Sequence, residues 1–182
     1  PLTGTKTIGG SSPDYATFAA AVSALNSNGV GAGGVTFLIR NMTETLSAMQ
    51  TISAIGSAAN PIVFKSENEN ASLVTLQRNN TPITISGQFI RFEHITITNT
   101  STSGSAIILG TNADNNMIDN CVLNGNTGAT TTWTNATIYS SQTTNGNGVD
   151  NFILRNSTIR RGSIGIYMVM NSTELPSGTV VE

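Results

Sequence analysis

The feature that most constrains the fold of this chain is a short motif that returns five times along the sequence. Each copy has the form apolar residue, any residue, apolar residue, charged residue, turn former. The copies occupy residues 37–41, 62–66, 90–94, 116–120 and 152–156, and only Asn116 departs from the apolar first position. Successive copies start between 25 and 36 residues apart, which is the spacing of a repeat whose units stack on one another.

Two further pairs of alternating residues follow each of the last three copies. The second pairs are Ile95 and Ile97, Cys121 and Leu123, and Ser157 and Ile159; the third pairs are Ala106 and Ile108, Ala136 and Ile138, and Ile164 and Ile166. Alternation turns one side of each short strand inward, so three pairs per repeat describe one coil of a three-faced solenoid. We therefore predict an all-β fold, a right-handed parallel β-helix of about five coils. Its expected inward column is Ile39, Phe64, Phe92, Ile118 and Leu154.

One segment near the N-terminus predicts a helix. Ser12 can act as its N-cap and Pro13 suits its first position. An apolar stripe of helical spacing follows, formed by Tyr15, Phe18, Val22 and Leu25, and residues 26–29 end the pattern. Since a stack of coils has an open apolar end, we expect this amphipathic helix to cap it.

The predicted organisation has three parts. Residues 1–34 form an N-terminal strand and the capping helix, with a flexible loop at residues 30–34, and residues 35–170 form the coils. Residues 171–182 form a linker or the start of a further coil, which suggests a fragment of a longer protein. Because no cap-like segment occurs there, we expect further coils, domains or copies of the chain itself to pack on that end, making a homo-oligomer one outcome.

The fifth position of the motif predicts a column of turns. Corners between short strands often need a left-handed backbone, which Asn tolerates best after Gly. The column would contain Asn41, Ser66, His94, Asn120 and Asn156. Cys121 lies where the interior narrows, and we interpret it as a small buried filler.

Composition excludes several classes of function. Only 10% of the residues are charged and the net charge is −2, so the concentrated positive surface of a nucleic-acid binder is missing. No apolar run approaches the roughly 18 residues of a membrane span. One cysteine and one histidine exclude a disulfide framework and a Cys/His zinc site, and we expect neither a metal nor a cofactor.

Three segments carry a family resemblance: TIGGSSPDYATFAAAVSAL at residues 7–25, PIVFKS at 61–66 and FIRFEHITI at 89–97. They resemble secreted right-handed parallel β-helix proteins, of the kind found as surface and adhesin-like proteins of Bacteroidetes within the broad pectin-lyase-like superfamily. The resemblance implies a secreted or cell-surface location. It also implies that enzymes on this fold act on acidic polysaccharides with paired carboxylates and an arginine.

The fourth position of the motif holds the best candidates for such chemistry: Arg40, Lys65, Glu93, Asp119 and Arg155. In the predicted register Glu93 and Asp119 lie one coil apart, and two carboxylates at that separation can divide acid and base roles. The alternative function is therefore a polysaccharide-active enzyme, similar to pectin lyase or methylesterase, that uses Glu93, Asp119 and Arg155. We favour the other interpretation, a surface ladder of charges, in which each pair contributes roughly 0–1 kcal/mol.

Aromatic residues supply the candidate ligand-binding site. Trp133 and Tyr139 lie in and just after a long polar segment at residues 125–135, where an exposed ring suits stacking on a sugar. Equally, Trp133 can fold over its own loop, and Arg160 and Arg161 can either bind a carboxylate or phosphate or remain solvated. The sequence thus favours an extracellular structural or adhesive module whose partner is a carbohydrate or another cell-surface ligand.

Overall fold

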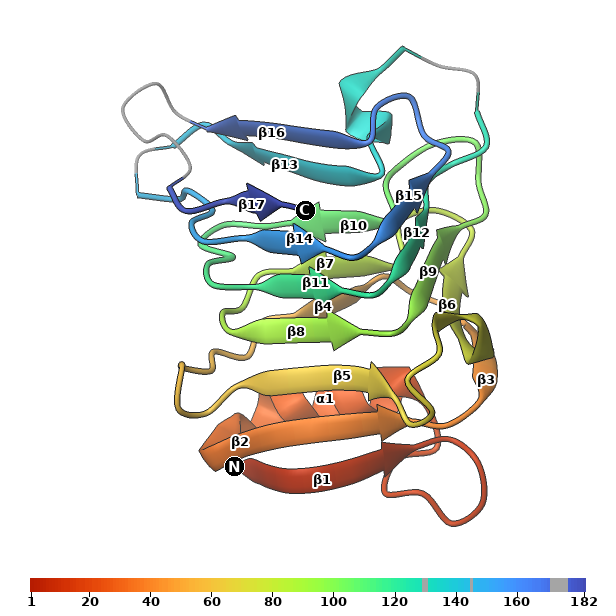
Figure 1. The fold of residues 1–182 in the computed structure, drawn as a ribbon, viewed down its shortest axis with the longest axis vertical. Coiled ribbons are helices and arrows are strands. Elements are labelled where there is room, and N and C mark those ends of the chain that lie inside the picture. The colour runs from red at the N-terminus through yellow and green to blue at the C-terminus, as the bar shows by residue number, and fades with distance from the viewer. Residues whose placement is uncertain (129–130, 145, 171–176) are drawn as a thin grey trace.

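The computed structural model describes residues 1–128, 131–144, 146–170 and 177–182. Its strands form three parallel sheets around a single core, as Figure 1 shows, and the predicted right-handed parallel β-helix is confirmed. β1 and β2 pair with each other in one sheet. From β2 onward, strands that follow one another in sequence lie in different sheets, and each pairs with the equivalent strand of the neighbouring coil. In the described ranges no helix is both long enough and apolar enough to cross a membrane.

Sheet 1 contains, in spatial order, β1 (Leu2–Ile8), β2 (Val30–Ile39), β5 (Ile62–Ser66), β8 (Ile90–Glu93), β11 (Met117–Asp119), β14 (Ile153–Arg155) and β17 (Val180–Val181). Sheet 2 contains β4 (Gln50–Ile52), β7 (Ile83–Ile85), β10 (Ile107–Leu109), β13 (Ile138–Gln142) and β16 (Ile166–Met170). Sheet 3 contains β3 (Met42–Thr45), β6 (Val74–Arg78), β9 (Thr96–Asn99), β12 (Val122–Asn124) and β15 (Thr158–Arg160). The helix α1 (Phe18–Asn28) lies between β1 and β2, and two 3-10 turns, η1 (Ala71–Leu73) and η2 (Trp133–Asn135), lie between strands.

The strand register agrees with the predicted repeat in four copies and corrects the first. Phe64 lies opposite Phe92, which lies opposite Ile118, as predicted. The first copy was placed two residues too late, because β2 sets Phe37, rather than Ile39, opposite Phe64. Apolar residues alternate throughout residues 35–39, so both registers satisfy the inward pattern and the sequence alone does not separate them.

The third inward pair needed a correction of one residue. Ile107, rather than Ile108, lies opposite Ile138 and is fully buried, while Ile108 faces outward on sheet 2. β10 consists of three consecutive apolar residues, and such a run hides the alternation that distinguishes the inner face from the outer one.

A stack of phenylalanines fills the first coils. The Phe37 and Phe64 ring centroids are 4.7 Å apart and those of Phe64 and Phe92 are 5.3 Å apart, with nearly parallel planes. Phe18 of α1 packs against the same stack, 5.2 Å from Phe64. Ile118 and Leu154 continue this buried column into the later coils.

The helix exists where predicted but begins later than expected. Its N-cap is Thr17, whose Oγ1 accepts a hydrogen bond from the Ala20 amide at 3.1 Å, and Ser12 and Pro13 lie outside it. The carboxylate of Asp14 does not cap the helix. It accepts hydrogen bonds from the amide and hydroxyl groups of Thr7, at 2.8 and 2.9 Å, and so fastens the preceding loop to β1.

The helix closes the open edges of sheets 2 and 3 at the N-terminal end of the solenoid. Glu44 occupies the inward column of sheet 3 next to Leu76, and its carboxylate accepts hydrogen bonds from the Phe18 and Ala19 amides at 2.7 and 3.4 Å. The helix N-terminus thereby stabilises a negative charge directed at the core. On sheet 2, the Asn26 side chain binds the main chain on both sides of Ile52, donating to Thr51 O and accepting from Ser53 N.

The remaining boundaries differ from the predicted ones. Residues 30–34 belong to β2 and not to a flexible loop, and β13 extends to Gln142. Within the predicted linker, residues 171–176 lie outside the described residues, while β17 pairs with β14. Further coils or copies at the C-terminal end stay a prediction.

Candidate functional site

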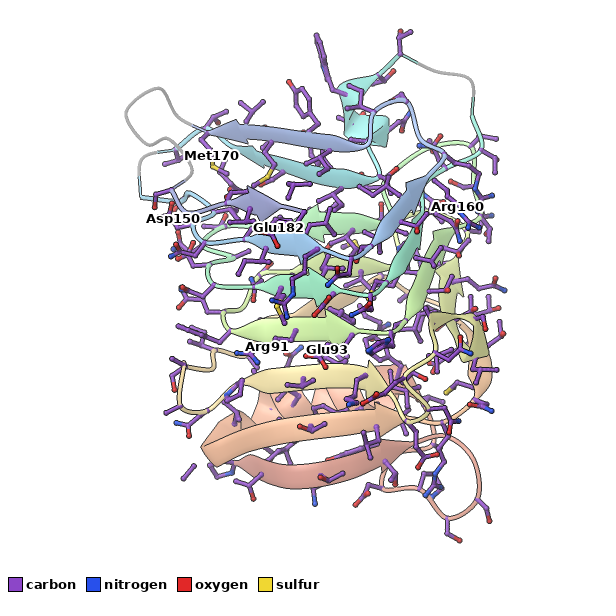
Figure 2. All side chains as sticks on the ribbon, viewed as in Figure 1. Arg91, Glu93, Asp150, Arg160, Met170 and Glu182 are labelled. Carbon is purple, nitrogen blue, oxygen red and sulfur yellow. The ribbon has the colours of Figure 1, made fainter. Side chains whose placement is uncertain are left out.

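The charged residues of the repeat form one outward column on sheet 1. The register places Lys65 beside Glu93, Glu93 beside Asp119, and Asp119 beside Arg155. Leu38 takes the first position of the column. Figure 2 shows Glu93 on the outer side of β8, away from the core. The structure therefore brings together the three residues of the alternative enzyme site.

Arg40 does not belong to this column, because the first copy of the motif is shifted by two residues. Its guanidinium lies beside the loop after β1, donating hydrogen bonds to the carbonyl oxygens of Gly9 and Ser11, and it forms an ion pair with Glu67 at 3.5 Å. The prediction that Arg40 lines the charged column was wrong.

Asp119 is the most constrained member of the column. Its Oδ2 accepts hydrogen bonds from Nε and Nη2 of Arg155, at 3.0 and 2.8 Å. Its Oδ1 accepts from the side-chain amides of Asn120 and Asn156, at 2.9 and 3.0 Å. Four N–H groups thus occupy the carboxylate of a residue that is 8% exposed, and two of the residues that supply them belong to the next coil.

The protonation state of Asp119 follows from these contacts. Burial pushes the pKa of Asp119 upward, but the hydrogen bonds from Arg155 and Asn156, together with the charge of Arg155, outweigh burial and hold the pKa below its ordinary value. A general acid needs a raised pKa and a general base needs an open lone pair. Asp119 therefore resembles a structural tie between coils more than a catalytic group.

Glu93 is in a different situation from its neighbour. Among the described residues its carboxylate has no hydrogen-bond or ion-pair partner, and the adjacent Lys65 binds Glu69 instead, at 2.7 Å. The column thus contains one saturated carboxylate and one open carboxylate. Within the described ranges, no three His, Cys, Asp or Glu side chains are grouped so as to hold a metal ion.

The corner after sheet 1 repeats a left-handed backbone conformation in three coils. His94, Asn120 and Asn156 have φ angles of 56°, 52° and 51°. The two earlier residues of the predicted turn column differ. Ser66 ends β5 opposite Ile39. Asn41 lies two residues beyond Ile39, and its Oδ1 accepts a hydrogen bond from the Asn68 side-chain amide at 2.8 Å. Neither has a positive φ, so the repeated corner begins only at β8.

Cys121 is buried next to this corner. Its thiol lies 3.3 Å from the Asp119 carbonyl oxygen, and burial raises the pKa of the thiol to about 12. A thiol with such a pKa has almost no thiolate at neutral pH, so it has little nucleophilic or metal-binding capacity.

The aromatic residues form a second cluster, between sheets 3 and 2. Trp133 lies in η2, and Tyr139 and Tyr167 are outward-facing partners on β13 and β16. The Trp133 and Tyr167 ring centroids are 5.7 Å apart, and those of Tyr139 and Tyr167 are 5.9 Å apart with a 4° angle between the planes. Trp133 nevertheless remains 59% exposed. We call these three residues the aromatic platform.

Tyr167 was not among the candidates from the sequence, although a signal for it was present. The predicted third pairs align Ile138 with Ile166, and this alignment already sets Tyr139 beside Tyr167 on the outer face. The position of Trp133 over Tyr167 is different in kind, since it depends on the path of a loop and not on the repeat.

Comparisons with known proteins give structural matches alone. No family model matches this chain, and no curated protein matches it. The chain is similar to a crystal structure of the pectin methylesterase from Aspergillus niger in penultimately deglycosylated form, with a TM-score of 0.47 and 14% identity over 92% of this chain and 71% of that one. It is similar also to that enzyme in deglycosylated form, with a TM-score of 0.47 and 13% identity over 100% of this chain and 77% of the other.

Proposed function

We propose that this chain is an extracellular β-helix module that binds carbohydrate on the aromatic platform and so contributes to adhesion. The observation that carries the proposal is the exposed indole of Trp133, which is supported from behind by Tyr167. An exposed indole normally loses rotamer freedom when a ligand binds to it. Here the stacked tyrosines restrict the ring beforehand, which lowers the entropic cost of binding.

A saccharide suits this surface better than an apolar partner does. Thr131, Thr132 and Thr134 flank the indole and are exposed, so a ring stacked on Trp133 would meet hydroxyl groups at its edges. Sugars combine apolar ring faces with polar rims, and an aromatic ring bordered by hydroxyls complements both. The low charge of the chain and the likeness of its opening segments to surface proteins agree with an extracellular setting.

The polysaccharide-active enzyme has weaker support. Its three residues lie together, but four hydrogen bonds occupy the Asp119 carboxylate, and Arg155 is engaged with it. Glu93→Gln and Asp119→Asn variants, assayed on a panel of uronate polysaccharides, separate the two functions. If the wild type turns over one of these polysaccharides and both substitutions abolish that turnover, the enzymatic function is established and the binding module is no longer the preferred function.

The binding function is tested by titrating glycans against the intrinsic fluorescence of the protein. Trp133 is the only tryptophan in the chain, so a change in emission reports directly on the platform. We expect Trp133→Ala to weaken binding about tenfold or more, since an aromatic contact is worth roughly 1 kcal/mol beyond the area it buries. Glycan-affinity electrophoresis provides the readout for this variant.

Ile55→Ala is the matched control, because Ile55 is an apolar side chain that is 65% exposed and lies outside the platform. In glycan-affinity electrophoresis, the glycan should retard Ile55→Ala as much as it retards the wild type. Equal binding by the Trp133→Ala and wild-type proteins, or no emission change with any glycan of the panel, would contradict the proposal.

A further inference from the structure

Two adjacent arginines lie at the same corner of the solenoid as the aromatic platform. Arg160 ends β15 on sheet 3, and Arg161 begins the turn that leads to sheet 2. Figure 2 shows Arg160 on the outer surface beside β15. Both side chains are exposed, and Arg161 has a left-handed backbone with φ 63°.

The arginine turn packs directly against the segment that carries Trp133. Ser163 Oγ donates a hydrogen bond to Thr132 O at 2.8 Å, and Thr137 Oγ1 donates to Arg161 O, also at 2.8 Å. These side-chain-to-main-chain hydrogen bonds fasten Thr132 and Thr137, which precede and follow Trp133 in sequence, to the turn. The segment that carries Trp133 and the turn that carries the arginines are therefore adjacent.

Within the ranges that the structure describes, no acidic side chain pairs with either arginine. Neither guanidinium has an ion pair or a hydrogen bond with any of the described residues. The sequence contains no Asp or Glu at residues 95–113, 120–149 or 151–173, and Asp114, Asp119 and Asp150 all lie on the sheet 1 side of the coil. As far as the described residues go, this corner thus presents two unpaired positive charges on a chain whose net charge is −2.

We infer that Arg160 and Arg161 form an anion-binding subsite beside Trp133, so that the saccharide on the platform carries a carboxylate or sulfate group. This inference rests on the proposed carbohydrate-binding function. The planar guanidinium fork matches both oxyanions, and hydrogen bonds between charged partners are about twice as strong as neutral ones. A sugar ring stacked on the indole would direct an acidic substituent toward the turn that holds both arginines.

The experiment compares three oligosaccharides of equal length by the emission of Trp133: a neutral galactan, its sulfated counterpart and a uronate. We expect the neutral ligand to bind most weakly. Arg161→Gln should weaken binding of the preferred acidic ligand about tenfold, the loss expected for a charged hydrogen bond, and Arg161→Lys should restore part of it. Higher salt concentration should weaken binding of the acidic ligand more in the wild type than in Arg161→Gln.

Arg91→Gln is the matched control, because Arg91 is also unpaired among the described residues but lies on sheet 1, on β8. It should leave all three affinities unchanged. The preferred acidic ligand identifies the source of the negative charge, carboxylate or sulfate. Two results would overturn the anion subsite while leaving the carbohydrate platform in place. One is that the neutral ligand binds at least as tightly as the acidic ligands do, and the other is that Arg161→Gln binds the acidic ligand with unchanged affinity. If none of the three oligosaccharides binds, both the anion subsite and the carbohydrate platform are overturned.

Discussion

Arg155 directs two nitrogen atoms at a single oxygen of Asp119, with Nε at 3.0 Å and Nη2 at 2.8 Å from Oδ2. The two residues face each other on β14 and β11, so the ion pair joins one coil to the next in the same direction as the main-chain hydrogen bonds. Asn120 and Asn156 complete the coordination of the carboxylate from the adjacent corner. Asp119, a residue of the charged column, thus helps to hold two neighbouring coils together.

The first prediction concerns the pH dependence of that tie. Because the folded-state pKa of Asp119 lies below its unfolded value, the carboxylate stabilises the fold fully above the unfolded pKa of about 3.9 and loses this effect as the pH falls through the folded pKa. Asp119→Asn should lower the free energy of unfolding by about 2 kcal/mol at pH 6, the worth of hydrogen bonds to a charged group. Urea unfolding at several pH values should show the difference from wild type shrinking below about pH 4.

Glu93→Gln serves as the control for this effect, since the Glu93 carboxylate has no partner among the described residues. Its unfolding free energy should stay within about 0.5 kcal/mol of wild type. A pH-independent loss in Asp119→Asn would show that packing, and not charge, accounts for the role of Asp119.

The second prediction concerns the phenylalanine stack. Phe64 is fully buried and contacts three other phenylalanine rings. Phe64→Ala should reduce the free energy of unfolding by about 3–5 kcal/mol, because the cavity lies between coils that cannot collapse separately. Phe64→Leu should cost clearly less. Chemical denaturation measures both, and equal losses for the two variants would mean that cavity volume does not determine the effect.

The third prediction concerns the contact between the cap and the first coil. Glu44→Ala removes the carboxylate that accepts the first amides of α1 and should destabilise the protein by about 1 kcal/mol. The effect should be local, with faster hydrogen exchange in α1 and β4 than in the later coils. Glu69→Ala, at an exposed carboxylate, is the comparison, and uniform acceleration along the chain would argue against a local cap.

The fourth prediction concerns the chemistry of Cys121. With a pKa of about 12 and a buried thiol, the native protein should resist alkylation at pH 8, whereas the protein in urea should react at the rate of a free cysteine. Mass spectrometry after timed exposure to iodoacetamide measures both rates. Rapid labelling of the native protein would show that this part of the coil opens readily.

The fifth prediction concerns the support of the platform. Tyr167→Ala removes the ring behind Trp133 and should increase quenching of the indole by acrylamide while weakening carbohydrate binding. Tyr167→Phe keeps the ring and should behave as the wild type. If Tyr167→Ala leaves quenching and affinity unchanged, the indole is held by its own loop, and Tyr167 has no positioning role.

The candidate site could be anticipated only in part from the sequence. Glu93, Asp119 and Arg155 occupy matching motif positions, so their adjacency follows from the repeat. The engagement of Asp119 by Asn120 and Asn156 does not, because it depends on the left-handed corner that brings both amides to one carboxylate. Similarly, the alignment of Ile138 with Ile166 contains the pairing of Tyr139 and Tyr167, but not the position of Trp133 above it.

Period and alternation alone determined that the chain coils into a three-sheet parallel solenoid, because a strand pattern repeated at a regular interval buries its apolar face only by stacking. Tertiary structure decided the register of β2, the start of α1 and the partners of each charged group. Alternating apolar residues satisfy two registers equally well, and the Glu44 carboxylate gains its partners, the Phe18 and Ala19 amides, from a segment distant in sequence. Such choices depend on differences in packing and hydrogen bonding that arise only when neighbouring coils are in contact.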